Sequence, residues 1–277
     1  MFLCLCLVLA PGLGKTKTGR LWTYARDGRP CGSDQPPAAV FFYSPDRKGE
    51  HPQSHLKNFK GILRADGYAG FNAIFEKRHV TEAACWAHVR RKFFDVHAAN
   101  GSAIAKEALD KITAHYAIEA QIKGWPPDER QHYRDDRAAP LIADLKAWLE
   151  ATLGRLSSKS ELDGAMRYAL SRWKALTNYI HDGRTSLDNN AAERSIRGIA
   201  LGHKNYLFAG SDSGGDRAAA IYSLIENCKL NTIDPETYLR DILARIPDHK
   251  INRINELLPW NWQATQNVAT HANHEPS

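Results

Sequence analysis

Apolar residues follow two different patterns along the chain. In its first third they form short runs between turn residues, a pattern typical of β-strands. Runs of strand length occupy residues 3–10, 21–25 and 39–43, and residues 11–19 form a Gly/Lys/Thr-rich turn after the first run. Because the three runs follow one another closely, we expect an antiparallel meander.

The next segment is predicted to alternate between helix and strand. Residues 51–59 favour a short helix, and residues 61–66 favour a strand that ends in Asp66. A second strand-like run covers residues 82–89, and the chain turns helical over residues 90–99. Together with the meander, this order predicts an α/β fold with a mixed sheet and helices on its faces.

From residue 102 to residue 180 the apolar period changes to that of helices. Leucine, isoleucine and aromatic residues recur at spacings of three and four, which indicates helices that pack against one another. Residues 124–127 and 157–160 divide the region into three helical stripes, and Pro140 is expected to kink the second. We interpret the region as a helical insertion whose stripes form core packing.

After the insertion, residues 188–197 predict one further helix. Asp188 and Asn189 are favourable N-cap residues, and the helix would carry Glu193 into its second turn. Glu193 and Arg197 share a face, and Arg194 lies beside them. A carboxylate among guanidiniums suits a site where a metal ion meets a phosphate. A capped surface helix with an ordinary ion pair explains the same spacing, and spacing alone leaves both interpretations open.

Two more helices are predicted near the C-terminal end of the sequence. They cover residues 216–230 and 235–246, the second with Asp234 as N-cap and Pro235 at its first position. The last stretch, residues 261–277, is polar, and we expect it to fray.

The composition is that of a globular protein. Apolar residues are 43% and charged residues 25% of the 277 residues, so disorder is not expected. Lys and Arg total 37 against 31 Asp and Glu, a net charge of +6 that is compatible with nucleic acid as a partner without establishing it. The 5 cysteines include no C-x-x-C pair, and no apolar run approaches the ~18 residues of a membrane span. We therefore expect a cytoplasmic protein with free thiols and no membrane contact.

A glycine-rich basic motif, G-L-G-K-T, occupies residues 12–16. It is similar to a phosphate loop, but the Walker pattern needs a glycine where Leu9 stands, and a strand rather than a helix is predicted after it. We interpret it as a basic hairpin turn, with a nucleotide-binding loop that uses Lys15 and Thr16 as the weaker alternative. The cations of this region that would lie along a DNA backbone are Lys15, Lys17 and Arg20.

Asp66 is the second carboxylate that the pattern singles out. It ends a predicted strand and Gly67 opens the loop after it, which is where α/β sheets place reactive groups. A simple loop cap is an equally good interpretation of Asp66 alone. Paired with Glu193, it makes a two-carboxylate site of the kind that Mg²⁺ prefers. Two such ions ~3.5–4 Å apart can activate a water or a 3′-hydroxyl and stabilise the leaving oxygen.

Residues 85–92 (C-W-A-H-V-R-R-K) form a compact run of mixed chemistry. One interpretation places His88 and Arg90 near a phosphate at the end of a strand. The other is a buried Cys/Trp strand followed by the solvated start of a basic helix. A zinc site is not indicated, because no second Cys/His pair has matching spacing.

Several sequence blocks together resemble the insertion-sequence-66 family of bacterial transposases. The blocks are G-K-T-K-T-G-R-L-W-T-Y-A-R-D-G-R-P at 14–30, A-D-G-Y-A-G-F at 65–71, C-W-A-H-V-R-R-K-F at 85–93, D-N-N-A-A-E-R at 188–194 and K-N-Y-L-F-A-G-S at 204–211. The run I-N-R-I-N-E-L-L-P-W at 251–260 is similar to the C-terminal element of that family. The blocks cover nearly the whole chain in order, which makes the resemblance specific.

The resemblance implies a ribonuclease-H-like mixed sheet with a large all-helical insertion and a helical C-terminal segment. It implies Mg²⁺- or Mn²⁺-dependent cleavage of DNA at element ends, followed by attack of a 3′-hydroxyl on target DNA. Asp66 corresponds to the second aspartate of the family's D-D-E triad, and Glu193 corresponds to the glutamate. The implied partners are double-stranded DNA and further copies of the chain bound on it. The side chains expected to contact DNA are Lys15, Lys17, Arg20, His88, Arg90, Arg91, Arg194, Arg197 and Lys204.

The same resemblance implies a domain order. Residues 1–100 would form the first part of the core and residues 101–182 the helical insertion. Residues 183–232 would form the second part of the core, which carries Glu193, and residues 233–277 the C-terminal element with a polar tail.

The sequence departs from the family pattern at its start. The place of the first aspartate holds Met1 to Cys4, and no acid stands before Asp27. The family's N-terminal DNA-binding and zinc-binding elements also have no counterpart. We therefore expect an N-terminally truncated transposase with weak metal binding and impaired activity. A non-catalytic remnant that binds DNA or oligomerises is the alternative.

Overall fold

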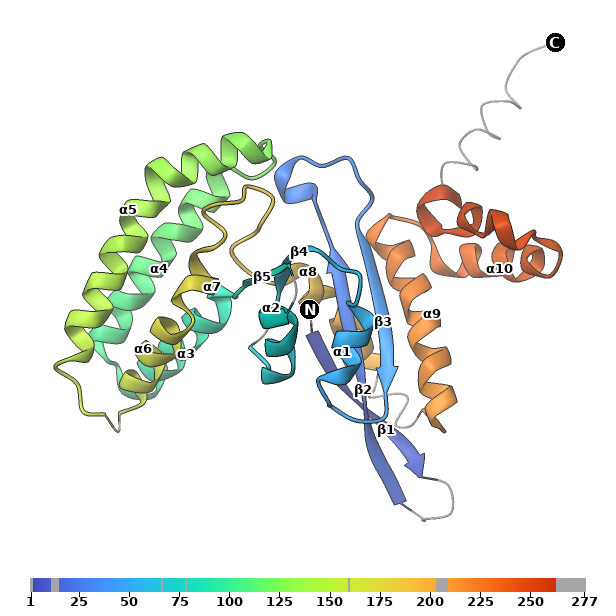
Figure 1. Cartoon of the computed structure of the whole chain (residues 1–277), viewed down its shortest axis with the longest axis horizontal. Helices are drawn as coiled ribbons and strands as arrows, with labels where there is room; N and C mark the ends of the chain where they lie inside the picture. The colour runs from blue at the N-terminus through green and yellow to red at the C-terminus, as the bar shows by residue number, and fades with distance from the viewer. Residues whose placement is uncertain are drawn as a thin grey trace, which may run out of the picture. The chain divides into compact units, whose positions relative to one another are not determined.

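A computed structural model describes most of the chain (Figure 1). The described residues are 2–10, 15–65, 67–77, 79–158, 160–202 and 209–262. Backbone contacts divide the chain into two compact units, which we treat separately. The meander unit comprises residues 2–27, 35–47 and the chain from 191 onward, and the helix-rich unit comprises residues 28–34 and 48–190.

The meander unit is built on a three-stranded antiparallel sheet. Its strands β1 (Phe2–Ala10), β2 (Lys15–Arg26) and β3 (Ala38–Ser44) pair in sequence order. The predicted meander is therefore confirmed. The predicted turn over residues 11–19 is too long, because residues from Lys15 onward already pair with β1.

One face of this sheet packs against α9 (Asp212–Leu230), which lies along β3 in Figure 1. Alternate residues of β3, among them Phe41 and Tyr43, are buried, and the residues between them are exposed. Leu21 of β2 stands opposite Tyr43 in the register and joins the same core, as does Ala219 of α9.

Side chains of α9 also cover the free edge of β3. Asn227 accepts a hydrogen bond from the Ala39 N–H (2.9 Å) and donates one to the Ala39 carbonyl (2.8 Å). The Ser223 hydroxyl accepts a hydrogen bond from the Phe41 N–H (2.9 Å). Unpaired groups on an edge strand would otherwise be available to other strands, so α9 completes the sheet on this side.

The remaining helices of the meander unit are α8 (Asn190–Gly202), which crosses the unit boundary at its first residue, and α10 (Pro235–Arg245). The 3₁₀ helices η3 (Ile246–Asp248) and η4 (Ile251–Leu257) follow α10. A second small core joins α9, α10 and η4, where the Tyr238 hydroxyl donates to the Leu257 carbonyl (2.6 Å).

The helix-rich unit contains a short parallel pair, β4 (Gly61–Arg64) and β5 (Val80–Ala83). Short helices surround the pair in the sequence. They are η1 (Arg29–Cys31), α1 (Glu50–His55), η2 (Ala69–Phe71) and α2 (Asn72–Lys77). The described strands thus form two sheets rather than the single mixed sheet that the element order predicts.

The predicted strand over residues 82–89 is wrong. β5 ends at Ala83, and α3 (Trp86–Asn100) begins directly after Cys85. The reason lies in the spacing of the buried residues of α3, which are Trp86, Val89, Phe93 and Val96. Spacings of three and four place them on one helical face, whereas strand alternation would divide them between two faces.

The helical region after α3 agrees with its apolar spacing. It contains α4 (Ala103–Gln121), α5 (Pro127–Leu153), α6 (Glu161–Ser171) and α7 (Trp173–Thr177). Pro140 lies inside α5 and does not divide that helix. The buried stripes of these helices and of α3 form one hydrophobic core.

No helix in the described ranges is both long enough and apolar enough to cross a membrane.

Candidate functional site

The helix α8 presents a charged face to solvent. Its buried residues Ala192, Ser195, Ile196 and Ile199 recur at helical spacing. The residues on the other side are Glu193, which is half-buried, and Arg194 and Arg197, which are exposed. Glu193 lies in the first turn of α8 rather than in the predicted second turn. The predicted grouping of one carboxylate with two guanidiniums on one helix is therefore present.

Two further acidic residues of the meander unit approach α8. Arg194 Nη2 lies 3.8 Å from the carboxylate of Asp27, whose side chain is only 7% exposed. Glu226 of α9 interacts with the hydroxyl of Ser195, and burial raises the pKa of Glu226 although the Ser195 hydrogen bond opposes that shift. α8 thus has polar contacts with Asp27, which directly follows β2, and with α9.

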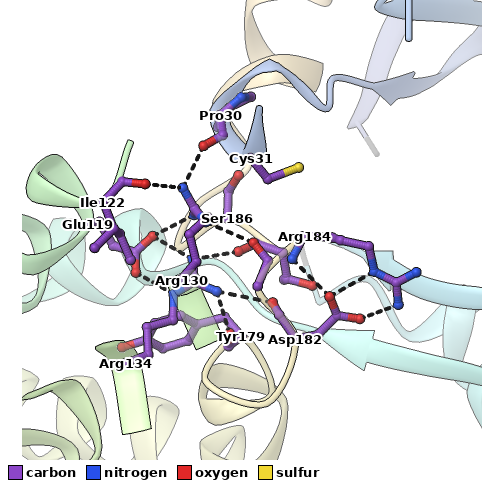
Figure 2. Close-up of polar contacts among 12 residues, drawn as sticks. Pro30, Cys31, Glu119, Ile122, Arg130, Arg134, Tyr179, Asp182, Arg184 and Ser186 are labelled. Atoms are coloured by element: carbon purple, nitrogen blue, oxygen red, sulfur yellow. Dashed lines mark hydrogen bonds and ion pairs between the residues drawn. The ribbon is translucent and has the colours of Figure 1, made fainter. Parts of the chain in front are cut away.

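The loop that leads into α8 is fixed by two buried arginines of α5 (Figure 2). Arg134 donates to the backbone carbonyls of Tyr179 (2.7 Å), Asp182 (3.0 Å) and Thr185 (2.8 Å). Arg130 donates to the carbonyl of Gly183 (2.8 Å). The carbonyls that accept these bonds lie between α7 and α8 and therefore need no water as a partner, so the arginines take the place of regular secondary structure in this loop.

Both arginines share one carboxylate, that of Glu119 on α4. Arg134 binds it with two parallel hydrogen bonds of 2.7 Å each, and Arg130 adds a third of 3.1 Å. The side chain of Arg134 is fully buried and that of Glu119 is 13% exposed. Arg130 also donates to the carbonyls of Pro30 and Ile122. We call Glu119, Arg130 and Arg134 the arginine cluster.

The last residues of this loop are held by β4 and by the start of α3. Arg64 donates to the carbonyls of Ser186 and Ala84. The backbone N–H of Trp86 donates a hydrogen bond to the carbonyl of Leu187 (3.2 Å). The segment that ends at Asn190 is therefore anchored along its length before the chain enters the meander unit.

Cys85 and His88 form a hydrogen-bonded pair at the N-terminus of α3. Burial would raise the pKa of the Cys85 thiol, but its hydrogen bond with His88, the charge of His88 and the backbone N–H of Asn189 lower that pKa overall. Cys85 is the N-cap residue of α3, and it is buried. His88 is thus positioned against a thiol, in the first turns of a helix rather than at the predicted strand end.

Arg90 and Arg91 line a pocket of about 640 Å³ in the helix-rich unit. The other lining residues are Ala87 and Phe94 from α3, Thr113 and Tyr116 from α4, and Asp188 from the loop before α8. Arg91 pairs with the neighbouring Asp95 (2.7 Å), and both side chains are largely exposed. Arg90 forms no ion pair with any residue that the structure describes.

The remaining predicted DNA contacts have varied surroundings. Lys17 forms an ion pair with Asp212 (2.6 Å) at the start of α9, and Asp212 also accepts from the Tyr43 hydroxyl. Those two hydrogen bonds lower the pKa of Asp212. Arg20 is half-buried in β2. Lys15 lies in β2, but its side chain is outside the described part of the chain, as are Asp66 and Lys204 altogether.

Sequence reasoning did not identify the arginine cluster or the aromatic residues of the pocket. Arg130 and Arg134 are spaced like the exposed face of a charged helix, so their sequence pattern carries no sign of burial. Phe94 gives a weak indication of a binding surface, because it is a large apolar residue on the polar side of α3. Tyr116 gives none, because it packs against the hydrophobic core.

Comparison with protein families gives two matches that together span most of the chain. The family described as "Transposase IS66 family" matches residues 6–217. The family described as "IS66 C-terminal element" matches residues 223–260.

Three curated relatives come from Sinorhizobium fredii. The uncharacterized protein y4hP is 43% identical over 265 residues, which cover 90% of this chain and 48% of the relative. The uncharacterized proteins y4qI and y4jD are each 37% identical, covering 92% and 93% of this chain and 49% and 52% of the relatives. The chain thus spans about half the length of the curated relatives it matches. No solved structure gives a significant match.

Proposed function

The chain belongs to the IS66 family of transposases, and from that premise we propose that it takes part in metal-dependent cleavage and transfer of DNA strands. The observation that carries the proposal is the exposed face of α8, where Glu193 stands with Arg194 and Arg197. The anchored loop before α8 supports it, because a catalytic carboxylate must be held on a rigid element.

Glu193 and Asp66 are the residues that would hold Mg²⁺ or Mn²⁺. Hard cations take oxygen ligands, and the half-buried carboxylate of Glu193 offers such oxygens at the start of a helix. The thiol of Cys85 suits softer metals and is not part of the proposed set. When bound, the ion would activate an attacking hydroxyl and stabilise the leaving oxygen of a phosphodiester.

The guanidiniums of α8 would bind DNA phosphates close to that carboxylate. Arg194 and Arg197 are exposed, so they reach a phosphate without prior unfolding. Arg90, Arg91 and His88 are proposed contacts on α3. Lys17 would have to exchange Asp212 for a phosphate, which we regard as a less favourable contact.

We further propose that the chain has a ribonuclease-H-like core. The support is the order of its strands and helices and the presence of the parallel pair β4–β5. Double-stranded DNA as substrate and oligomerisation on DNA are proposals for the whole protein.

The metal proposal is tested by titrating Mn²⁺ into the protein and following the loss of the free-ion electron paramagnetic resonance signal. We expect Glu193→Gln to weaken binding at least tenfold. Glu236→Gln on α10 is the matched control, because the Glu236 side chain is 79% exposed and pairs with Arg240 on the same helix. Equal affinity of the Glu193→Gln variant and the control would exclude Glu193 as a ligand.

The DNA proposal is tested by fluorescence anisotropy on a labelled 40-base-pair duplex over a range of salt concentrations. The slope of log K against log salt is negative, and each lost phosphate contact lowers its magnitude by roughly 0.9. We therefore expect Arg194→Ala/Arg197→Ala to lower it by roughly 1.8. Arg240→Ala should leave it unchanged. An unchanged slope in the double variant would remove α8 from the interface.

The same duplex separates the catalytic proposal from the non-catalytic alternative. Strand cleavage in Mg²⁺ that disappears in Glu193→Gln supports catalysis. Duplex binding without cleavage, in either metal, supports a DNA-binding or oligomerising role.

A further inference from the structure

The pocket in the helix-rich unit combines cations and aromatic rings in one concavity. It lies where α3 and α4 pack side by side, and it is lined at one end by Asp188. Its volume of about 640 Å³ falls within the ~300–1,000 Å³ range of small-ligand sites. A DNA duplex is too wide to enter a concavity of this size, whereas one nucleotide fits.

We propose that this pocket binds a single unpaired nucleotide of a DNA strand. The inference rests on the proposed function and names the state of the DNA that this part of the chain would bind. Arg90 and Arg91 would pair with the phosphate, and Phe94 and Tyr116 would stack on the base.

The cations are suitably placed for the phosphate. Arg90 is exposed and forms no ion pair with any described residue, so no existing contact has to be broken. The Arg91–Asp95 pair is exposed and four residues apart in one helix. Such pairs contribute little to stability, and a phosphate can replace the carboxylate at small cost.

The aromatic rings supply a surface for the base. Phe94 is 45% exposed, whereas the other large apolar residues of α3, which are Trp86, Val89, Phe93 and Val96, are buried. Tyr116 of α4 packs against the hydrophobic core at the same pocket. Stacking of a base on an aromatic ring is tolerant of sequence and is the main source of affinity for single strands.

Asp188 adds a preference among bases. A carboxylate only accepts hydrogen bonds, so it favours a base with an amino group over one that presents a carbonyl there. Cytosine and thymine are similar in size and stacking, but cytosine carries an amino group at the position where thymine carries a carbonyl. The pocket should therefore prefer cytosine to thymine.

The test measures anisotropy of labelled ten-nucleotide single strands, dC10 and dT10, with the full chain. We expect Phe94→Ala to weaken binding of dC10 about tenfold. Phe59→Ala is the matched control, because Phe59 is also an exposed phenylalanine of the same unit outside the pocket. Arg90→Ala should weaken both strands alike, with Arg137→Ala on α5 as its control. Asp188→Asn should abolish the preference for dC10, and thermal melting confirms that each variant is folded.

The outcomes separate this proposal from the proposed function. Loss of blunt-duplex binding in Arg194→Ala/Arg197→Ala, with blunt-duplex binding retained in Phe94→Ala, supports both. An equal effect of Phe94→Ala and Phe59→Ala on dC10 would overturn the pocket proposal and leave duplex binding through α8 intact. Equal affinity for dC10 and dT10 would overturn the role of Asp188. Competition by free deoxycytidine monophosphate as strong as that by dC10 would show that the pocket takes free nucleotides rather than a strand.

Discussion

The arginine cluster makes a strong prediction about the loop before α8, and Arg134→Met is the variant that tests it. Methionine keeps most of the length and apolar character of the side chain, so the change removes the guanidinium with little loss of packing. The variant would leave Glu119 with one hydrogen bond from Arg130. It would also leave three loop carbonyls without their donor.

The expected cost follows from burial. Arg134 is 0% exposed and Glu119 is 13% exposed, so the carboxylate that remains is poorly solvated. Breaking a buried ion pair by removing one partner typically costs about 3–5 kcal/mol. The lost carbonyl bonds belong to the same network and are not added to this figure. At roughly 2–4 °C for each kcal/mol, the melting temperature should fall by roughly 6–20 °C.

Three comparisons distinguish the cluster from a general loss of charge. Arg137→Met on the same helix removes an exposed arginine that pairs with Asp136, and it should cost less than ~1 kcal/mol. Hydrogen exchange of the amides between residues 179 and 190 should accelerate in Arg134→Met and stay unchanged in Arg137→Met. A double variant, Glu119→Gln/Arg134→Met, should cost less than the sum of its two single variants, because the hydrogen bonds between Arg134 and Glu119 can be lost only once.

Similar melting temperatures for Arg134→Met and Arg137→Met would refute the reasoning. So would a double variant whose loss of stability equals or exceeds the sum of the two single losses, since that would mean that Glu119 stabilises the fold independently of Arg134.

Two further predictions concern protonation and the sheet edge. His115 is buried against Trp86, none of the described residues forms a hydrogen bond with its ring, and burial lowers its pKa from 6.5 to about 4. The unfolded chain therefore binds the extra proton first, and up to about 3 kcal/mol of stability present above pH 6.5 should be lost as the pH falls towards 4. Urea unfolding from pH 4 to 7 should show this slope in the native chain, and a His115→Phe variant with an equal slope would contradict it. Asn227→Leu should destabilise the meander unit by about 2 kcal/mol, because it removes both bonds to Ala39, whereas Ser223→Ala removes one bond to β3 and should cost about 1 kcal/mol. Equal urea midpoints for the two variants would be inconsistent with a covered edge.

The sequence by itself determined the local elements of this protein. Three short apolar runs, at residues 3–10, 21–25 and 39–43, and their close spacing were enough for the antiparallel meander. Helical spacing predicted the insertion, and the segment 188–197 predicted α8 with Glu193, Arg194 and Arg197 on one side. These features depend on contacts within one element or between neighbours in the chain, and periodicity records such contacts directly.

Tertiary structure decided the features that join distant residues. Arg134 lies 15 residues from Glu119 and 45 from Tyr179, and nothing in its neighbourhood in the sequence distinguishes it from the exposed Arg137. The start of α3 at Trp86 followed from packing of its buried stripe, which overrode the strand propensity of residues 82–89. Burial of a charge depends on which partners converge on it in space, so the arginine cluster and the pocket beside α3 become visible only once the helices are packed.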